Sequence, residues 1–327
     1  MRLFAFAIRE YDEKIYLEQI CSELNIEYGY TSDYPSLNNL QLAKGYDAIS
    51  IITNPIDSKM LDILKEYGIK AISTRSIGYD HIDYNYAKEI GIKICNVSYS
   101  PNSVANYTIM MILMACRKID YIMKKCALQD FSLNGNCGRE LSLSTVGVIG
   151  TGRIGEALIK HLSGFGCRIL AYDLYEKESV KQYAEYVNLD ELYAQSDIIS
   201  LHVPGLPENN HMICAESISK MKDGVILVNA ARGMLIDTPA LIDGLNSGKI
   251  GFAALDTFEN EKGLYYLSYQ DKVLNNKDFH LLSGMPNVML SPHMAFYTDE
   301  AVSDMVANSV KGLLSAVNNE ESPFIVQ

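Results

Sequence analysis

Basic residues are in the minority in this sequence of 327 residues. Its 28 Lys and Arg are outnumbered by 40 Asp and Glu, which gives a formal net charge of −12. No stretch gathers enough basic side chains to neutralise a run of phosphates. We therefore expect no nucleic-acid partner.

The sequence also has no cysteine framework and no long apolar run. Its seven Cys residues are odd in number, scattered and never spaced as C-x-x-C, a pattern that fits a reducing compartment. The most apolar stretch, 109–116, is far shorter than a membrane span, and the run 3–8 is too brief for a secretory signal. We expect a cytoplasmic protein with no membrane partner.

What the sequence does contain is an alternation of β-rich and amphipathic stretches. Strand-like runs at 3–8, 48–52, 71–73 and 92–97 alternate with helix-like stretches at 14–24, 58–67 and 83–90. A second series of strand-like runs occupies 145–149, 168–172, 198–202, 225–229, 252–255 and 288–290. Strand and helix in alternation predict parallel sheets with helices on both faces.

The chain length favours two domains, and the boundary is expected near Ser100. The turn Ser100-Pro101-Asn102-Ser103 precedes a long helix that runs to about Arg117. The last helix-like stretch, 299–316, can return to the first domain. We therefore predict an α/β protein with two doubly wound parallel-sheet domains, one formed by residues 1–100 and 299–327 and the other by residues 101–298.

A glycine-rich turn follows the first strand of the second series. Gly150, Gly152 and Gly155 form the pattern G-x-G-x-x-G between an apolar strand and a helix, which is the context of a Rossmann dinucleotide site. Asp173 ends the next strand, where an acid binds the ribose hydroxyls and repels a 2′-phosphate. We predict NAD as the cofactor, in preference to NADP.

Three later segments place reactive side chains just after strand-like runs, where open parallel sheets bind ligands. They are NAARG (229–233), LDTFENE (255–261) and SPHMAFYT (291–298). Reduction of a 2-oxo acid needs a cation for the carboxylate, a proton donor for the carbonyl oxygen and a hydride from a nicotinamide. Arg, His and the dinucleotide motif supply these three functions.

On these motifs, together with GTGRIG and LHVP (201–204), the sequence resembles the NAD-dependent D-2-hydroxyacid dehydrogenase family over nearly its whole length. The resemblance implies that Arg232 binds the substrate carboxylate, His293 is the acid/base and Glu261 orients His293. The family spacing from Arg to Glu selects Glu261 over Glu259, which we interpret as a solvated neighbour. The resemblance further implies a flavodoxin-like substrate domain and a homodimer or tetramer.

The resemblance also implies the wider binding site. Substrate-binding residues would be Ile52, Ile77, Gly78, Tyr99 and Phe296. Cofactor-binding residues, beyond the three glycines and Asp173, would be Arg153, Ile154, Val203, Pro204, Asn209, Ala230, Ala231 and Asp256. The other histidines are interpreted as surface or core residues, namely His81, His161, His202, His211 and His280. No metal is predicted, because Asp80-His81-Ile82-Asp83 lacks further ligands at suitable spacing.

Three functions remain open at this point. The first is reduction of pyruvate to D-lactate, which the resemblance to D-lactate dehydrogenases favours. The second is a D-2-hydroxyisocaproate-type enzyme for bulkier 2-oxo acids, because Ile52 is aliphatic where D-lactate enzymes often have an aromatic residue. The third is an NADH-sensing protein similar to the corepressors of the same fold, and the absence of a long disordered tail counts against it.

Overall fold

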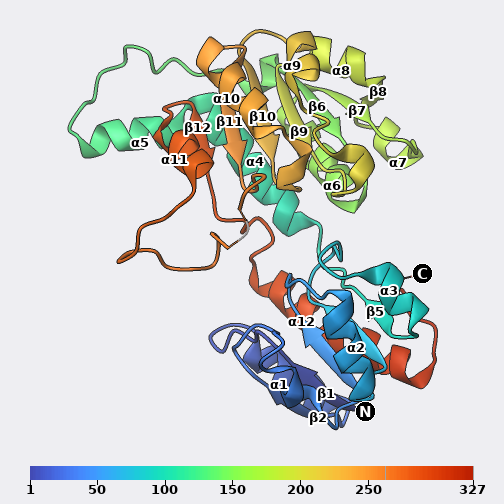
Figure 1. The fold of residues 1–327 in the computed structure, drawn as a ribbon. Helices are drawn as coiled ribbons and strands as arrows, with labels where there is room; N and C mark the ends of the chain where they lie inside the picture. The colour runs from blue at the N-terminus through green and yellow to red at the C-terminus, as the bar shows by residue number, and fades with distance from the viewer. Residues whose placement is uncertain (262, 327) are drawn as a thin grey trace. The chain divides into compact units, whose positions relative to one another are not determined.

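The computed structural model describes residues 1–261 and 263–326, which divide into two compact units (Figure 1). The first unit combines Met1–Ser100 with Tyr297–Gln327, and the second is Pro101–Phe296. Each contains one parallel sheet, of five strands in the first unit and seven in the second. This confirms the predicted fold class.

The first unit has the strand order β2-β1-β3-β4-β5, which is that of flavodoxin-like folds. Its strands are β1 (Arg2–Ala5), β2 (Glu27–Tyr30), β3 (Ala48–Ile51), β4 (Ala71–Thr74) and β5 (Lys93–Cys95). Its α-helices are α1 (Lys14–Glu23), α2 (Ser58–Glu66), α3 (Tyr84–Glu89) and α12 (Asp299–Asn318). The last helix packs on β3, β4 and β5 and beside α1.

Side chains of β1 alternate between the two faces of this sheet. Leu3 and Ala5 join the apolar cluster of α1 and α12, whereas Phe4 joins the cluster of α2 and α3. Both faces are therefore covered by helices, as is usual for parallel sheets. The carboxyl ends of the strands are left at one edge, where loops carry the polar residues.

The second unit has the strand order β12-β11-β10-β9-β6-β7-β8. Its strands are β6 (Thr145–Ile149), β7 (Arg168–Tyr172), β8 (Glu185–Tyr186), β9 (Ile198–Leu201), β10 (Val225–Asn229), β11 (Ile250–Leu255) and β12 (Val288–Leu290). Its α-helices are α4 (Asn102–Arg117), α5 (Ile119–Ala127), α6 (Arg153–Leu162), α7 (Glu178–Lys181), α8 (Leu189–Gln195), α9 (Ala215–Lys220), α10 (Thr238–Ser247) and α11 (Lys277–Gly284). The order reverses between β6 and β9, and ligands of open α/β sheets bind at such a switch point.

The structure differs from the predicted elements mainly at edges and ends. Strands β2 and β8, at the outer edges of the two sheets, were not predicted. Strand β1 ends at Ala5, whereas the apolar run continues to Ile8, because Ala7 has a positive φ of 53° that ends the extended backbone. Helix α6 begins at Arg153, directly after the second glycine of the motif.

Candidate active site

The predicted glycine turn connects β6 to α6 and is packed so closely that two of its glycines cannot carry a side chain. Gly150 has a φ of +96°, and a Cβ there would lie 2.6 Å from the carbonyl group of His202. A Cβ on Gly155 would lie 1.9 Å from the carbonyl oxygen of Gly150. A Cβ on Gly152 would meet nothing within 4 Å, so the backbone before α6 is open to a ligand.

Asp173 follows β7 and stands beside this turn. Its Oδ2 accepts hydrogen bonds from the backbone N–H of Thr151 at 2.6 Å and from the Thr151 hydroxyl at 3.1 Å. Its Oδ1 accepts the N–H of Tyr175 at 3.1 Å. The N-terminus of α6, which begins at Arg153, and the fixed carboxylate of Asp173 give the donor and acceptor arrangement that a dinucleotide requires, so these residues fit NAD.

The other predicted cofactor residues lie at the carboxyl ends of β9 and β10. Val203 and Pro204 follow β9, and the Pro204 carbonyl accepts a 2.9 Å hydrogen bond from the side chain of Asn209. Ala230 and Ala231 follow β10 in the same way. Because β6, β9 and β10 are parallel neighbours, these segments share one edge of the sheet with the glycine turn.

His293 follows β12 and is joined to Glu261. Its Nδ1 lies 2.7 Å from Glu261 Oε1, and the second oxygen of Glu261 accepts the backbone N–H of Phe258 at 3.0 Å. His293 has a positive φ of 50°. Its own N–H donates to the carbonyl oxygens of Asp256 at 2.9 Å and Ser291 at 3.0 Å. The imidazole is therefore held from the backbone and from one ring nitrogen.

Asp256, predicted as a cofactor contact, organises the loop that carries His293. It is 0% exposed, and burial raises its pKa although its hydrogen bonds oppose that shift. Its carboxylate accepts the Ser291 hydroxyl at 2.6 Å and the N–H groups of Met294 at 3.0 Å and Ala295 at 2.9 Å. This role of Asp256 was not predicted, and its position directly after a buried strand was the signal for it in the sequence.

Arg232 follows β10, and its loop lies against the loop of Glu261. Its Nη1 donates to the carbonyl oxygen of Ala231 at 2.9 Å. A Cβ on Gly233 would lie 2.1 Å from the carbonyl oxygen of Phe258, so the two backbones touch. The structure thus brings the loops of Arg232, Glu261 and His293 together at the carboxyl edge of the second sheet.

The interpretation of Glu259 as a solvated neighbour is wrong. Its Oε1 lies 2.5 Å from Nε2 of His211, and its Oε2 accepts the N–H of Thr238 at 3.3 Å. His211 in turn donates its backbone N–H to the carbonyl oxygen of Met234 at 2.9 Å. Glu259 and His211 therefore connect the segment after Arg232 to the loop that carries Glu261. The contact joins segments that are far apart in the sequence, so neither segment predicts it.

The predicted substrate residues Ile52, Ile77, Gly78 and Tyr99 belong to the first unit, and Phe296 to the second. Ile52 follows β3. After β4, the Ser76 hydroxyl donates to the Gly78 carbonyl oxygen at 2.6 Å, and the Asn96 side chain donates to the Ile77 carbonyl oxygen at 2.8 Å. These bonds fix the shape of the loop 75–78.

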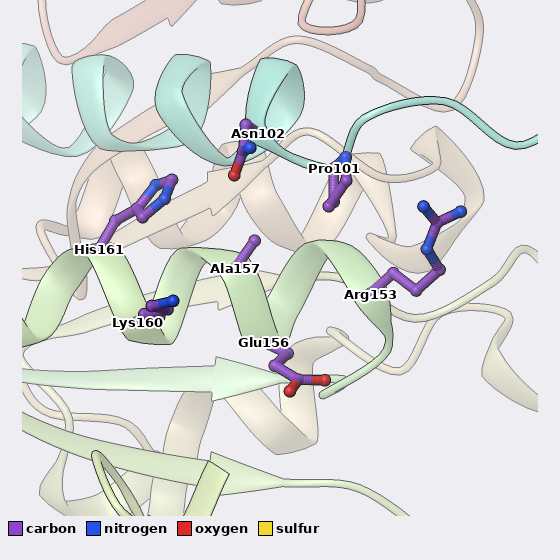
Figure 2. Close-up of a pocket in the computed structure, with 7 residues that line it drawn as sticks. All are labelled: Pro101, Asn102, Arg153, Glu156, Ala157, Lys160 and His161. Atoms are coloured by element: carbon purple, nitrogen blue, oxygen red, sulfur yellow. The ribbon is translucent and has the colours of Figure 1, made fainter. Parts of the chain in front are cut away.

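A hollow of about 450 Å³ lies where the start of α4 meets α6. Figure 2 shows the residues that line it, which are Pro101, Asn102, Arg153, Glu156, Ala157, Lys160 and His161. The Glu156 carboxylate is paired with Lys177 at 3.0 Å and with the Ser179 hydroxyl at 2.7 Å. Among these lining residues, Arg153 is the one that also belongs to the predicted cofactor site.

Within residues 1–261 and 263–326, no three His, Cys, Asp or Glu side chains come together in a way that could hold a metal ion. None of the helices described there is long and apolar enough to cross a membrane.

Known proteins resemble this chain over its whole length. A family model described as D-isomer specific 2-hydroxyacid dehydrogenase, NAD binding domain, matches residues 109–295. An aromatic 2-oxoacid reductase from Clostridium sporogenes is 45% identical over 322 residues, which cover 96% of this chain and 95% of the relative. A D-lactate dehydrogenase from Leuconostoc mesenteroides subsp. cremoris is 40% identical, with 100% of both chains covered.

Solved structures agree with these relatives. A D-2-hydroxyisocaproate dehydrogenase matches with a TM-score of 0.89 at 36% identity, covering 100% of this chain and 99% of that one. The NAD-complexed form of a D-isomer specific 2-hydroxyacid dehydrogenase from Lactobacillus delbrueckii ssp. bulgaricus matches with a TM-score of 0.85 at 29% identity, covering 100% of both chains. The predicted cofactor, NAD, is confirmed, and the chain belongs to the D-isomer specific 2-hydroxyacid dehydrogenase family.

Proposed function

We propose that this chain reduces 2-oxo acids to D-2-hydroxy acids with NADH, with His293 as the acid, Glu261 as its partner and Arg232 as the carboxylate-binding residue. The observation that carries the proposal is the 2.7 Å contact of His293 Nδ1 with Glu261 Oε1. The loop of Arg232 lies in backbone contact with the loop of Glu261. NADH, when bound, supplies the hydride for the carbonyl carbon.

The protein residues supply the proton and the orientation. A hydrogen bond from Nδ1–H to the Glu261 carboxylate leaves Nε2 of His293 to donate to the carbonyl oxygen, and the carboxylate stabilises the imidazolium. Arg232 presents a planar fork of N–H donors that matches a carboxylate in two places. Asp256 keeps the His293 loop in place through three hydrogen bonds.

For the substrate we propose a 2-oxo acid with a side chain larger than the methyl group of pyruvate, and aromatic 2-oxo acids in the first place. Ile52 follows β3 with an aliphatic side chain that leaves more room than an aromatic ring. The 45% identical relative named an aromatic 2-oxoacid reductase supports the same class. Pyruvate is the second candidate, supported by the 40% identical relative named a D-lactate dehydrogenase.

Two substitutions with matched controls test the catalytic assignment. His293→Gln should lower kcat by about 10²- to 10⁴-fold, the usual contribution of a general acid. Arg232→Lys should mainly raise KM for the 2-oxo acid, because Lys offers no bidentate contact. His280→Gln and Arg168→Lys change exposed side chains of the same types and should leave both constants unchanged. Near-native kinetics in either test variant would contradict the assignment.

We also propose a homodimer that uses α5 and the segment after it. No residue of α5 is buried, and Met123, Leu128, Phe131 and Leu133 are all exposed. Figure 1 shows this helix and the following loop along the outside of the second unit. Apolar side chains gathered in this way favour a protein interface. Light scattering should give twice the chain mass, and Phe131→Ser with Leu133→Ser should give the single mass; an unchanged mass would contradict the proposal.

The cytoplasm remains our proposed compartment. All seven Cys side chains are free thiols in this structure, and three of them are buried. Seven cysteines without a disulfide fit a reducing environment.

A further inference from the structure

We propose that Tyr266 is a positioning residue for His293, whose hydroxyl holds the backbone of His293 in the conformation that directs the imidazole to Glu261. This inference rests on the proposed function of His293. Tyr266 lies in the loop between β11 and α11, after the LDTFENE motif, and is not among the predicted site residues.

The contact is direct. The Tyr266 hydroxyl donates to the backbone carbonyl oxygen of His293 at 2.6 Å. The two rings lie 6.3 Å apart between centroids and are tilted by 42°. Tyr266 therefore binds the carbonyl group of the residue that carries the proposed acid, whereas the carbonyl oxygens of Asp256 and Ser291 bind its N–H.

His293 needs such a restraint because its backbone is in the left-handed region. A φ of 50° brings the Cβ of an L-residue close to the following carbonyl oxygen, so an unrestrained histidine leaves this conformation. Its N–H is fixed by two carbonyl oxygens, and its carbonyl is fixed by Tyr266. When the carbonyl is released, the imidazole direction depends on Glu261 and the N–H bonds alone and is less firmly fixed.

Two neighbouring tyrosines show that the position is specific. Tyr265 packs its ring edge-on against Phe258, with 5.7 Å between centroids. Tyr269 donates its hydroxyl to the carbonyl oxygen of Gly263, within the same loop. The Tyr266 side chain is 55% exposed, so removal of its hydroxyl leaves the packed core intact.

The experiment compares Tyr266→Phe with Tyr269→Phe, which removes a hydroxyl from the same loop without touching His293. We expect Tyr266→Phe to lower kcat by roughly two- to tenfold, the effect of one hydrogen bond, with NADH affinity unchanged. The solvent isotope effect on kcat should rise, because a displaced imidazole makes proton delivery slower. Tyr269→Phe should match the wild type in kcat, in NADH affinity and in the solvent isotope effect.

A second measurement tests the inference independently of turnover. The chain has six histidines, so its ¹³C-labelled imidazole signals can be resolved, and His293 is assigned by its loss in His293→Gln. Tyr266→Phe should shift the His293 signal, whereas Tyr269→Phe should not. An unshifted signal together with wild-type kcat, or equal changes in both variants, would overturn the inference. A wild-type protein that reduces no 2-oxo acid would instead refute the proposed function.

Discussion

Arg75 should be the most important single side chain for the stability of the first unit. It is 1% exposed and is paired with Glu13, which is 0% exposed, through a 2.9 Å contact of its Nε with Glu13 Oε1. Its Nη2 donates to the carbonyl oxygens of Phe6 at 3.1 Å and Ala7 at 2.8 Å, and its Nη1 donates to the Ser50 hydroxyl at 3.0 Å. Arg75 therefore connects β4 to the ends of β1 and β3.

The substitution Arg75→Met keeps the volume and removes the charge. It leaves a buried carboxylate with one remaining cation, Arg9, at 3.5 Å from Glu13. Loss of one partner from a buried ion pair lowers the free energy of unfolding by about 3–5 kcal/mol. Because Arg9 still pairs with Glu13, we expect a value near the lower end of this range. For a unit of this size, about 3 kcal/mol corresponds to a melting temperature lower by roughly 10 °C.

The same ion pair makes the free energy of unfolding depend on pH. Burial raises the pKa of Glu13, but Arg75 and Arg9 outweigh it and hold that pKa below its ordinary value of 4.5. The stabilisation is therefore complete above the unfolded pKa and is lost as the pH falls through the lower, folded value. Without Arg75 the folded pKa rises, so the variant should lose less stability on acidification than the wild type does.

Scanning calorimetry of the whole protein measures these changes. The control is Arg168→Met, which breaks an exposed pair with Glu185 and should lower the melting temperature very little. Adding Glu13→Gln to Arg75→Met should recover part of the loss, because the unpaired charge is then removed. Equal melting temperatures for Arg75→Met and Arg168→Met would show that the buried pair stabilises the fold no more than the exposed pair does.

Three other outcomes concern the second unit. Gly155→Ala places a Cβ 1.9 Å from the Gly150 carbonyl oxygen, so NADH binding by fluorescence titration should be lost; retained affinity would contradict the packing. Asp173→Ala should lower the ratio of kcat/KM for NADH over NADPH, and an unchanged ratio would count against Asp173. Burial lowers the pKa of His202 from 6.5 to about 4. Below pH 6.5 the unfolded chain therefore binds a proton that the folded chain excludes, and the free energy of unfolding should fall by up to about 3 kcal/mol between pH 6.5 and 4. His202→Asn should lack this loss in urea titrations.

The central strands were predictable because both of their faces are buried. Runs such as those of β6, β9 and β10 are apolar at nearly every position, as parallel strands between two helix layers must be. Strand β2 escaped prediction because it lies at the sheet edge with mixed burial, and its sequence EYGY contains a glycine. Strand β8 has only two residues and carries too little pattern to detect.

The positions of the site residues were predictable to the extent that they end buried strands. Asp173, Arg232 and His293 all follow such strands, and the motifs supplied their identities. The supporting contacts were not predictable, because they join segments that are far apart in the chain. The Glu259–His211 pair and the Tyr266–His293 bond depend on how the loops fold over one another, which no local pattern records.

The activity proposed for this chain is the reduction of a 2-oxo acid to the D-2-hydroxy acid with NADH. The most direct test is the initial rate of NADH oxidation with phenylpyruvate, 2-oxoisocaproate and pyruvate, followed by chiral analysis of the product. We predict D products and the highest kcat/KM for phenylpyruvate. A preference for pyruvate would overturn the proposed substrate class alone. An L product would contradict the proposed D specificity. NADH binding without turnover of any of the three acids would contradict the proposed activity and favour an NADH-sensing protein.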